Sequence, residues 1–433
     1  MNSGQAEKYT LKQGFSPMSV WAFSIGTAIG WGSLVVTCNT YLASAGILGT
    51  VLGLIVGMAV ILVISHNLQY MIVQNPDAGG IYSFAKKSVG HDYGFLAAWF
   101  LFLTYTAILW ANITSVPLFA RYFIGDIFRF GWHYHIFGYE VWLGEALISM
   151  LAVFITGIFC INSKKLVHIV IIIAALLFTV GFTVCTIWAL AKHGETGFSY
   201  EPSFIADSSS ISQIARVAVI SPWAFIGFEN VAHFSEEYNF QRNRIRRILT
   251  ASVVLSTVLY IFVSLLSVSA YPPEYASWLE YIQDMGNLSG IKAVPSFYAI
   301  SYYLGSKGVT ILMLALMGAI VTSLIGNTIA LSRLLYAAGR DGDASSKFAV
   351  LNEKGVPQNA IYFVILITFL VPFLGRTAIG WIVDVTTLGA TIIYLLLSYA
   401  IFRYASKTGH SREDYRHSGH SPDGALHSHA ASA

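Results

Sequence analysis

The sequence predicts an all-α polytopic membrane protein with about ten transmembrane helices. The chain has 433 residues, of which 55% are hydrophobic and only 11% are charged. Its mean hydropathy is +0.63. The apolar residues are gathered in long uncharged runs, and about 20 such residues cross a bilayer as one helix. This composition excludes a soluble domain, which needs far more polar surface.

The uncharged runs define the predicted helices in chain order. No Asp, Glu, Lys or Arg occurs between Lys12 and Asp77, which leaves room for two helices of about 20 to 25 residues. We expect the turn between them at Asn39 and residues 43–46. Six further runs predict one crossing each: 93–120, 146–163, 166–191, 248–273, 308–332 and 355–375. Two weaker runs, 213–235 and 377–402, contain charged residues and complete the ten.

The basic residues predict the orientation in the membrane. Most of the 25 Lys and Arg residues fall in short connections on the same side as the N-terminus. The connections on the other side hold only Arg121, Arg129, Lys192, Lys292, Lys307 and Arg376. Because Lys and Arg concentrate in cytoplasmic loops, both termini are predicted to be cytoplasmic. The longest outer connection, 272–307, is expected to form short helices on the outer face, with a candidate role as a lid.

The composition also narrows the function. The net charge is only +3, and the basic residues lie in short loops, so nucleic acid is not a predicted partner. The three cysteines lie in apolar runs or at their edges and indicate neither a disulfide framework nor a metal site. No Ser/His/Asp arrangement, metal cluster or phosphate loop is present in the sequence, and we therefore predict no enzyme, no cofactor and no direct ATP coupling.

The chain divides into a membrane domain and a tail. Residues 1–403 are predicted to form one transmembrane domain without a cleaved signal peptide. Residues 404–433 are polar and include several histidines. A solvated, disordered cytoplasmic tail is favoured over weak metal binding by these histidines.

Two of the predicted spans contain a break. The first span contains Gly26, Gly30 and Gly32 in a single stretch of ten residues, 24–33. Each of these glycines costs about 1 kcal/mol relative to Ala in a helix. Residues 221–229 interrupt a later span with Pro222 and a further glycine. One interpretation is a GxxxG packing contact. The other is a binding site, because paired broken helices in two halves of a chain are typical of transporter sites. The second break favours the binding site.

If spans one to five and six to ten form two halves, their odd number makes them insert with opposite orientation. The first half then covers about residues 15–192 and the second about 212–403. The two broken helices become the first helix of each half. This equivalence is what an inverted repeat requires.

Four segments resemble motifs of the amino acid, polyamine and organocation (APC) permeases, and of their amino acid permease branch in particular. Residues 26–32 (GTAIGWG) resemble the first-helix motif, and 225–229 (FIGFE) with 235–237 (SEE) resemble the sixth-helix motif. Residues 76–82 (PDAGGIY) and 332–342 (SRLLYAAGRDG) resemble the loop after the second helix and the end of the eighth. The resemblance covers about residues 15–403. It implies an inverted five-plus-five helix repeat, alternating access and a bacterial plasma (inner) membrane.

The resemblance also implies an amino acid or related amine held between helices one, three, six, eight and ten. The substrate carboxylate would meet the first break at Thr27, Gly30, Trp31 and Gly32. The amine would meet freed carbonyls near Ala28, Ile226 and Gly227. Helix electrostatics independently support this placement of the carboxylate, because the half-helix after a break presents unpaired N–H groups and a positive dipole end to an anion.

Two residues of the sixth span have competing interpretations. The resemblance implies an aromatic gate for Trp223, and the alternative is a lipid-facing side chain. For Glu229 it implies gating or proton coupling, because an acid inside a span is costly and usually functional. The alternative is a neutral hydrogen-bonding residue that only holds helix six to a neighbour.

The coupling ion is left open between H⁺ and Na⁺. Thr322 and Ser323 in the eighth span are candidate sodium ligands, although adjacent hydroxyls in a membrane helix are more often packing or back-bonding residues. Some proton-coupled members carry a lysine inside helix five, whereas Lys164 and Lys165 lie at its start here. Many family members also have twelve helices rather than ten.

The leading hypothesis is a secondary active transporter, either a symporter or an antiporter, for an amino acid or related amine. The alternative is a transporter-like amino acid receptor or sensor without net flux. The sequence does not select the oligomeric state.

Overall fold

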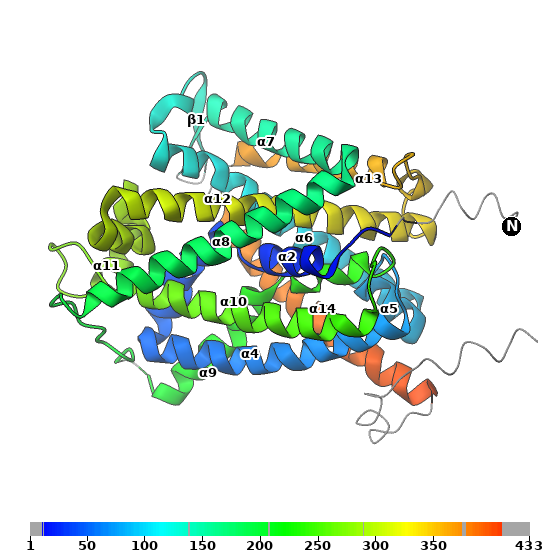
Figure 1. The fold of residues 1–433 in the computed structure, drawn as a ribbon, viewed down its shortest axis with the longest axis horizontal. Helices are drawn as coiled ribbons and strands as arrows, with labels where there is room; N and C mark the ends of the chain where they lie inside the picture. Colours follow the sequence, from blue (N-terminus) through cyan, green and yellow to red (C-terminus); the bar gives the residue numbers. More distant parts are fainter. Residues whose placement is uncertain are drawn as a thin grey trace, which may run out of the picture.

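Long helices run side by side along one axis and form a bundle (Figure 1). The computed structural model describes residues 11, 13–136, 139–206, 208–288, 290–374 and 378–408. The helices of the first half, with their single-turn segments, are α2 (Pro17–Ala28), α3 (Trp31–Val36), the π-helical η2 (Thr37–Leu42), α4 (Ala43–Gln74), α5 (Ile81–Ser88), α6 (His91–Phe123), η3 (Asp126–Phe128), α7 (Leu143–Asn162) and α8 (Lys164–His193).

The second part of the chain also consists of long helices joined by short ones. Its elements are α9 (Ser210–Ile220), η4 (Ser221–Phe225), η5 (Phe228–Phe234), η6 (Arg242–Arg244), α10 (Ile245–Val268), α11 (Trp278–Asp284), η7 (Met285–Asn287), η8 (Gly290–Ala293), α12 (Pro295–Arg340), η9 (Ser346–Ala349), α13 (Gln358–Thr368), η10 (Val371–Leu374) and α14 (Ala378–Thr408). The predicted tail begins at 404, but residues 404–408 still belong to α14; the rest of the tail lies outside the described residues.

The all-helical fold is confirmed, whereas the count of ten spans is not. Eight helices of the described chain are long and apolar enough to cross a membrane. The other two predicted crossings are divided. The first is broken after the 12 residues of α2, and the ninth consists of the 11 residues of α13 followed by η10. A break shortens each regular piece below the length that a single span needs.

Of the turn predicted at Asn39 and residues 43–46, the structure shows a bend at Gly46 and none at Asn39. Asn39 lies inside the π-helical segment η2, and helical structure continues from Trp31 to Gln74. The chain bends at Gly46, the last residue of the predicted segment, whose φ of 66° is a left-handed conformation. A Cβ at this position would also lie 2.5 Å from the carbonyl oxygen of Ser203. The bend therefore requires both a positive φ and the absence of a Cβ, and only glycine meets both requirements at low cost.

One end of the bundle carries short elements. The predicted short helices between 272 and 307 are present as α11, η7 and η8, while residues from Pro295 onward already belong to α12. A left-handed Gly305, with φ of 62°, bends α12 near its start. A hairpin that the sequence did not predict joins β1 (His133–Ile136) to β2 (Tyr139–Trp142), with His133 opposite Trp142.

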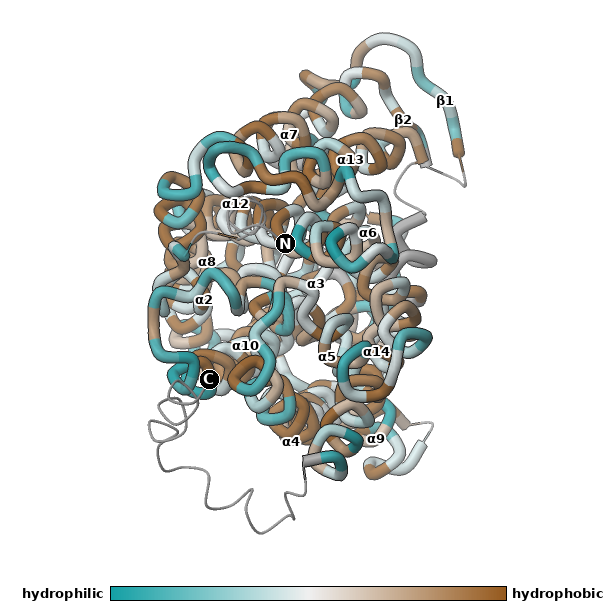
Figure 2. The backbone as a smooth tube through the Cα atoms, turned by 90° about the vertical axis from the view of Figure 1, so that its right-hand side faces the viewer, coloured by the Kyte–Doolittle hydropathy of each residue, from teal (hydrophilic) through white to brown (hydrophobic). Residues whose placement is uncertain are grey.

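Apolar side chains fill the core and also cover the outside of the bundle. The core is one large cluster to which most of the long helices contribute. Ile173, Val180 and Trp188 of α8 are nevertheless more than half exposed. Figure 2 shows the same pattern end-on, with hydrophobic helices and hydrophilic connections at the near end. An apolar outer surface of this extent fits a bilayer rather than water.

Candidate functional site

The first helix is broken where the sequence predicts it. Helix α2 ends at Ala28, Ile29 and Gly30 are extended, and α3 begins at Trp31. The N–H of Gly30 donates to the Ser33 hydroxyl at 3.2 Å, which stabilises the start of α3. The extended dihedral angles of Gly30, with φ of −141°, suit any residue. Its special requirement is space, because a Cβ there would lie 2.6 Å from Oδ1 of Asn112.

The second break lies between η4 and η5. Gly227 has φ of 107°, and a Cβ on it would lie 2.6 Å from the carbonyl oxygen of Thr27. The two breaks therefore touch. The Thr27 hydroxyl lies 2.7 Å from the Gly227 carbonyl oxygen and joins them across 200 residues of sequence. The packing interpretation applies to Gly26, which presses against Thr322 of α12.

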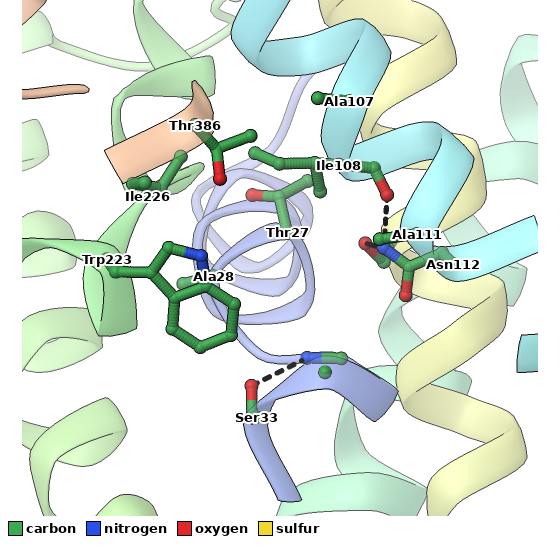
Figure 3. Close-up of a pocket in the computed structure, with 13 residues that line it drawn as sticks. Thr27, Ala28, Ser33, Ala107, Ile108, Ala111, Asn112, Trp223, Ile226 and Thr386 are labelled. Carbon is green, nitrogen blue, oxygen red and sulfur yellow. Dashed lines mark hydrogen bonds between the residues drawn. The ribbon is translucent and has the colours of Figure 1, made fainter. Parts of the chain in front are cut away.

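A cavity of about 50 Å³ lies between the two breaks (Figure 3). Its walls come from the first break, α6, η4, α12 and α14, which correspond to the five helices that the resemblance implies. The lining residues are Thr27, Ala28, Gly30, Gly32, Ser33, Ala107, Ile108, Ala111, Asn112, Trp223, Ile226, Ser323 and Thr386. None of these thirteen residues carries a charged side chain.

Most of the predicted site residues meet at this cavity. Thr27, Ala28, Gly30, Gly32, Trp223 and Ile226 line it. Trp223 therefore faces the cavity, and its ring lies 3.5 Å from where a Cβ of Gly32 would be. Trp31 is buried in the core and Gly227 lies behind the wall, so neither lines the cavity.

The resemblance implies that the third helix, here α6, contributes to the site, but Asn112 of this helix was not predicted as a site residue. Asn112 donates through Nδ2 to the Ile108 carbonyl at 2.8 Å and to the Ser323 hydroxyl at 2.9 Å. These bonds fix the amide so that Oδ1, a buried acceptor, has no hydrogen-bond partner in the described chain. The available signal was an amide in the middle of the uncharged run 93–120. Ser33 and Thr386, which also line the cavity, had no comparable signal.

Glu229 supports the second break from behind the cavity. It is 1% exposed, and its Oε2 accepts from the Gly227 N–H at 2.9 Å and from the Tyr394 hydroxyl at 3.1 Å. The Tyr105 hydroxyl also bonds to this carboxyl group. Tyr105 in turn lies 3.3 Å from Nε2 of His233. Side-chain contacts therefore link Glu229 to α6, α14 and the far end of η5.

The two candidate sodium ligands lie in different surroundings. The Thr322 hydroxyl bonds back to the Gly318 and Ala319 carbonyls, each at 2.9 Å, and lies 3.4 Å from the Gly26 carbonyl oxygen. The Ser323 hydroxyl accepts from Asn112 and, at 3.2 Å, from Asn327. Thr322 thus makes the back-bonding contacts considered as the alternative, and Ser323 belongs to the cavity wall.

An ion-pair network joins the motifs at residues 76–82, 235–237 and 332–342. It lies at the end of the bundle where α10 begins and α12 ends, here called the basic end (Figure 1). Arg340 contacts Asp77 at 2.9 Å and Glu236 at 3.1 Å. Glu237 contacts Arg333 and Lys164, both at 2.9 Å. Burial alone would raise the pKa of Glu237, but the two cations outweigh it and hold that pKa below its usual value.

A second acidic group ties α5 to the end of α12. Asp343 accepts from Lys86 and Tyr82, each at 2.7 Å, and contacts His91 at 2.8 Å. Burial raises the pKa of Asp343, yet these hydrogen bonds and the Lys86 charge outweigh it and lower the pKa to about 2. A lowered acid pKa stabilises the fold above the unfolded value, and this contribution is lost as pH falls through the folded value.

We therefore expect the protein to lose thermal stability as pH falls from about 4 to about 2, with part of the loss due to Asp343. The Asp343→Asn variant should be less stable than wild type at pH 7 and should show a smaller further loss at low pH. Thermal unfolding in detergent across this range measures both. Parallel curves for the two proteins would contradict the assignment.

An apolar helical bundle with two touching helix breaks around a small cavity defines a membrane transporter of the inverted-repeat class. A solved structure of a Na⁺-coupled sialic acid symporter, in a substrate-bound outward-open state, has the same fold: the TM-score is 0.57 at 12% identity, covering 92% of this chain and 81% of that one.

The profile of the amino acid permease family matches residues 19–419, and the chain belongs to that family, whose members are transporters and not enzymes. It is 22% identical to the γ-aminobutyric acid permease of Escherichia coli (strain K12), over 92% of this chain and 82% of the relative. It is 21% identical to the aromatic amino acid transport protein AroP of the same strain, over 93% and 84%.

Proposed function

We propose that the protein is a secondary active transporter that moves an amino acid, or a related amine, by alternating access. The observation that carries the proposal is the contact of the two breaks around one uncharged cavity. A break exposes N–H groups at the start of one half-helix and carbonyl groups at the end of the other. The pair therefore offers donors to a carboxylate and acceptors to an ammonium group.

The substrate carboxylate is assigned to the first turn of α3. This turn begins at Trp31, directly after the extended Gly30. No cationic side chain lines the cavity, so the helix dipole and main-chain donors supply the positive potential. Trp31 contributes through its backbone in this assignment, because its side chain lies in the core.

The substrate ammonium group is assigned to the opposite wall. The carbonyl groups near Ala28 and Ile226 end their half-helices beside the cavity. Oδ1 of Asn112 is a further acceptor at the cavity, and it lies beside Gly30 rather than on this wall. It has no hydrogen-bond partner in the described chain. Because a buried acceptor without a partner costs about 1–3 kcal/mol, an ammonium group that reaches it gains affinity.

The main test is uptake of labelled amino acids and amines into proteoliposomes under pH, Na⁺ or counter-substrate gradients. We expect net flux, and we expect α-amino acids with both groups free to compete about 5- to 150-fold better than their esters or N-acyl derivatives, since each lost polar contact removes roughly 1–3 kcal/mol. Binding without flux would support the receptor alternative. Equal competition by the blocked analogues would contradict the site.

The same gradients identify the coupling ion. Thr322 and the Gly26 carbonyl are adjacent oxygens at the first break, which supports Na⁺ as one candidate. Uptake that depends on Na⁺ and falls in Thr322→Val, but not in Thr310→Val on the exposed face of α12, would identify this position as a sodium ligand. Uptake that follows the pH gradient alone would assign the coupling to H⁺.

Glu229 is the proposed coupling group. An ionised carboxylate inside a span costs about 2.5–3.5 kcal/mol on insertion scales, and the described contacts of Glu229 include no cation. It is therefore expected to hold a proton while the site is closed and to release it when the site opens to water. In Glu229→Gln the pH dependence of net transport should be lost, while substrate exchange continues.

The control for this variant is Tyr394→Phe, which removes one hydrogen bond and keeps the carboxyl group. Its pH profile should resemble that of wild type. If Glu229→Gln keeps both the wild-type pH profile and the wild-type exchange rate, Glu229 only holds the second break in place.

The remaining assignments follow from the repeat and the charges. We assign residues 15–192 and 212–403 to the two inverted halves. We assign the basic end to the cytoplasm because Lys and Arg concentrate there. Both termini are then proposed to be cytoplasmic, and the membrane is proposed to be a bacterial plasma membrane. Reaction of single introduced cysteines with a membrane-impermeant reagent in intact cells tests this orientation.

A further inference from the structure

A second cavity lies outside the candidate site, in the groove between α4 and α10 near the basic end. The two helices lie side by side in Figure 1, and α4 passes the start of α10 there. The cavity measures about 390 Å³. It is lined by Leu62, Val63, Ser65, His66, Arg246 and Thr250. None of these residues lines the cavity between the breaks, so the groove is a separate feature.

The polar part of this groove is cationic. Arg246 and Thr250 are one helical turn apart on α10 and face Ser65 and His66 of α4 across the cavity. Arg246 is exposed. Within the described part of the chain, no carboxylate forms an ion pair with it. Arg244 and Arg247 add positive charge at the same helix start. An anionic group is the complement that this pocket lacks.

The groove continues from this pocket as an apolar track. Val254 and Val258 follow Thr250 at four-residue spacing on α10, and about two fifths of each side chain is exposed. On α4 the corresponding residues are Val56, Val60 and Val63, which are exposed by 47%, 50% and 63%. Four-residue and three-residue steps keep each set on one helix face. A cationic head and two apolar stripes therefore follow one another along the outside of the bundle.

We propose that this groove binds one anionic phospholipid, with its phosphate on Arg246 and an acyl chain along the valine stripes. The order of the features selects a lipid over a soluble anion. The pocket continues into the exposed apolar surface of two candidate spans, and a free phosphate would gain nothing from the stripes. Basic pockets between transmembrane helices are suited to anionic headgroups, and guanidinium groups bind phosphate with two parallel hydrogen bonds.

The test uses the purified full-length chain, delipidated in detergent and titrated with phosphatidylglycerol or phosphatidylcholine of the same acyl chains. Native mass spectrometry counts the bound lipids. We expect one tightly bound phosphatidylglycerol, preferred by about fivefold over phosphatidylcholine, since one basic residue at a membrane surface contributes about that factor. Arg246→Gln should abolish the preference. Arg403→Gln, which removes an exposed arginine of α14 outside the cavity, should preserve it.

Two further arms keep the result interpretable. Val63→Trp retains every charge and fills the apolar track at an exposed position, so it should weaken retention of long-chain phosphatidylglycerol. Inorganic phosphate at millimolar concentration should not displace the lipid. Equal loss in Arg403→Gln, or no loss in Arg246→Gln, would reduce the effect to general charge attraction and overturn the proposal. Displacement by phosphate with no effect of Val63→Trp would identify a soluble-anion site instead.

Discussion

Replacement of Gly30 by leucine is expected to abolish substrate binding while the protein still inserts and folds. A Cβ at this position would lie 2.6 Å from Oδ1 of Asn112, and the rest of the leucine side chain would occupy a cavity of only about 50 Å³. We expect the dissociation constant to rise by at least about 100-fold, equivalent to roughly 2.7 kcal/mol. Binding of labelled substrate to the purified variant measures this change.

Two variants calibrate the result. Gly30→Ala adds only the Cβ, which displaces the hydrogen-bonded Asn112 amide without filling the cavity, so the loss should be intermediate. Gly194→Leu adds the same leucine at the end of α8, where no atom would lie within 4 Å of the added Cβ, and should bind normally. An unchanged affinity in Gly30→Leu would mean that this glycine serves helix packing, as Gly26 does.

Loss of the Glu237 carboxylate is expected to have the largest effect on stability. Glu237 is fully buried, and Arg333 is only 3% exposed. Removing one partner of a buried ion pair leaves the other charge buried without compensation, which costs about 3–5 kcal/mol. Glu237→Gln should therefore lower the unfolding free energy, measured by denaturant titration in mixed micelles, by about that amount. The basic end, where this pair joins the segment after η5 to α12, should open most easily.

The matched control is Asp126→Asn, which removes one exposed carboxylate partner of Arg129 and leaves its other partner, Glu140, in place. It should change the unfolding free energy by less than about 1 kcal/mol. The double variant Glu237→Leu/Arg333→Leu should recover part of the loss, because an apolar pair avoids the burial of one unpaired charge. Equal effects of Glu237→Gln and Asp126→Asn would show that the buried pair does not hold this end together.

Features that follow from local energetics were predictable from the amino-acid order. Hydropathy locates the long spans, because each must satisfy its own backbone hydrogen bonds in lipid. The breaks at Gly30 and Gly227 were predictable for a similar reason, since glycines are costly inside a helix. The motifs around Asp77, Glu237 and Arg340 indicated the family before any contact among them was known.

Features that depend on the approach of distant segments emerged only from the folded bundle. Two contacts join residues far apart in the chain: Thr27 with Gly227, and Glu237 with Arg333. The placement of the Asn112 acceptor at the cavity likewise depends on how several helices pack. Of the predicted turn at Asn39 and residues 43–46, only Gly46 bends the chain, and it does so where it approaches Ser203 closely. Periodicity and hydropathy describe one helix at a time. Which polar groups meet inside the bundle is set by the packing of several helices together, and no local pattern encodes it.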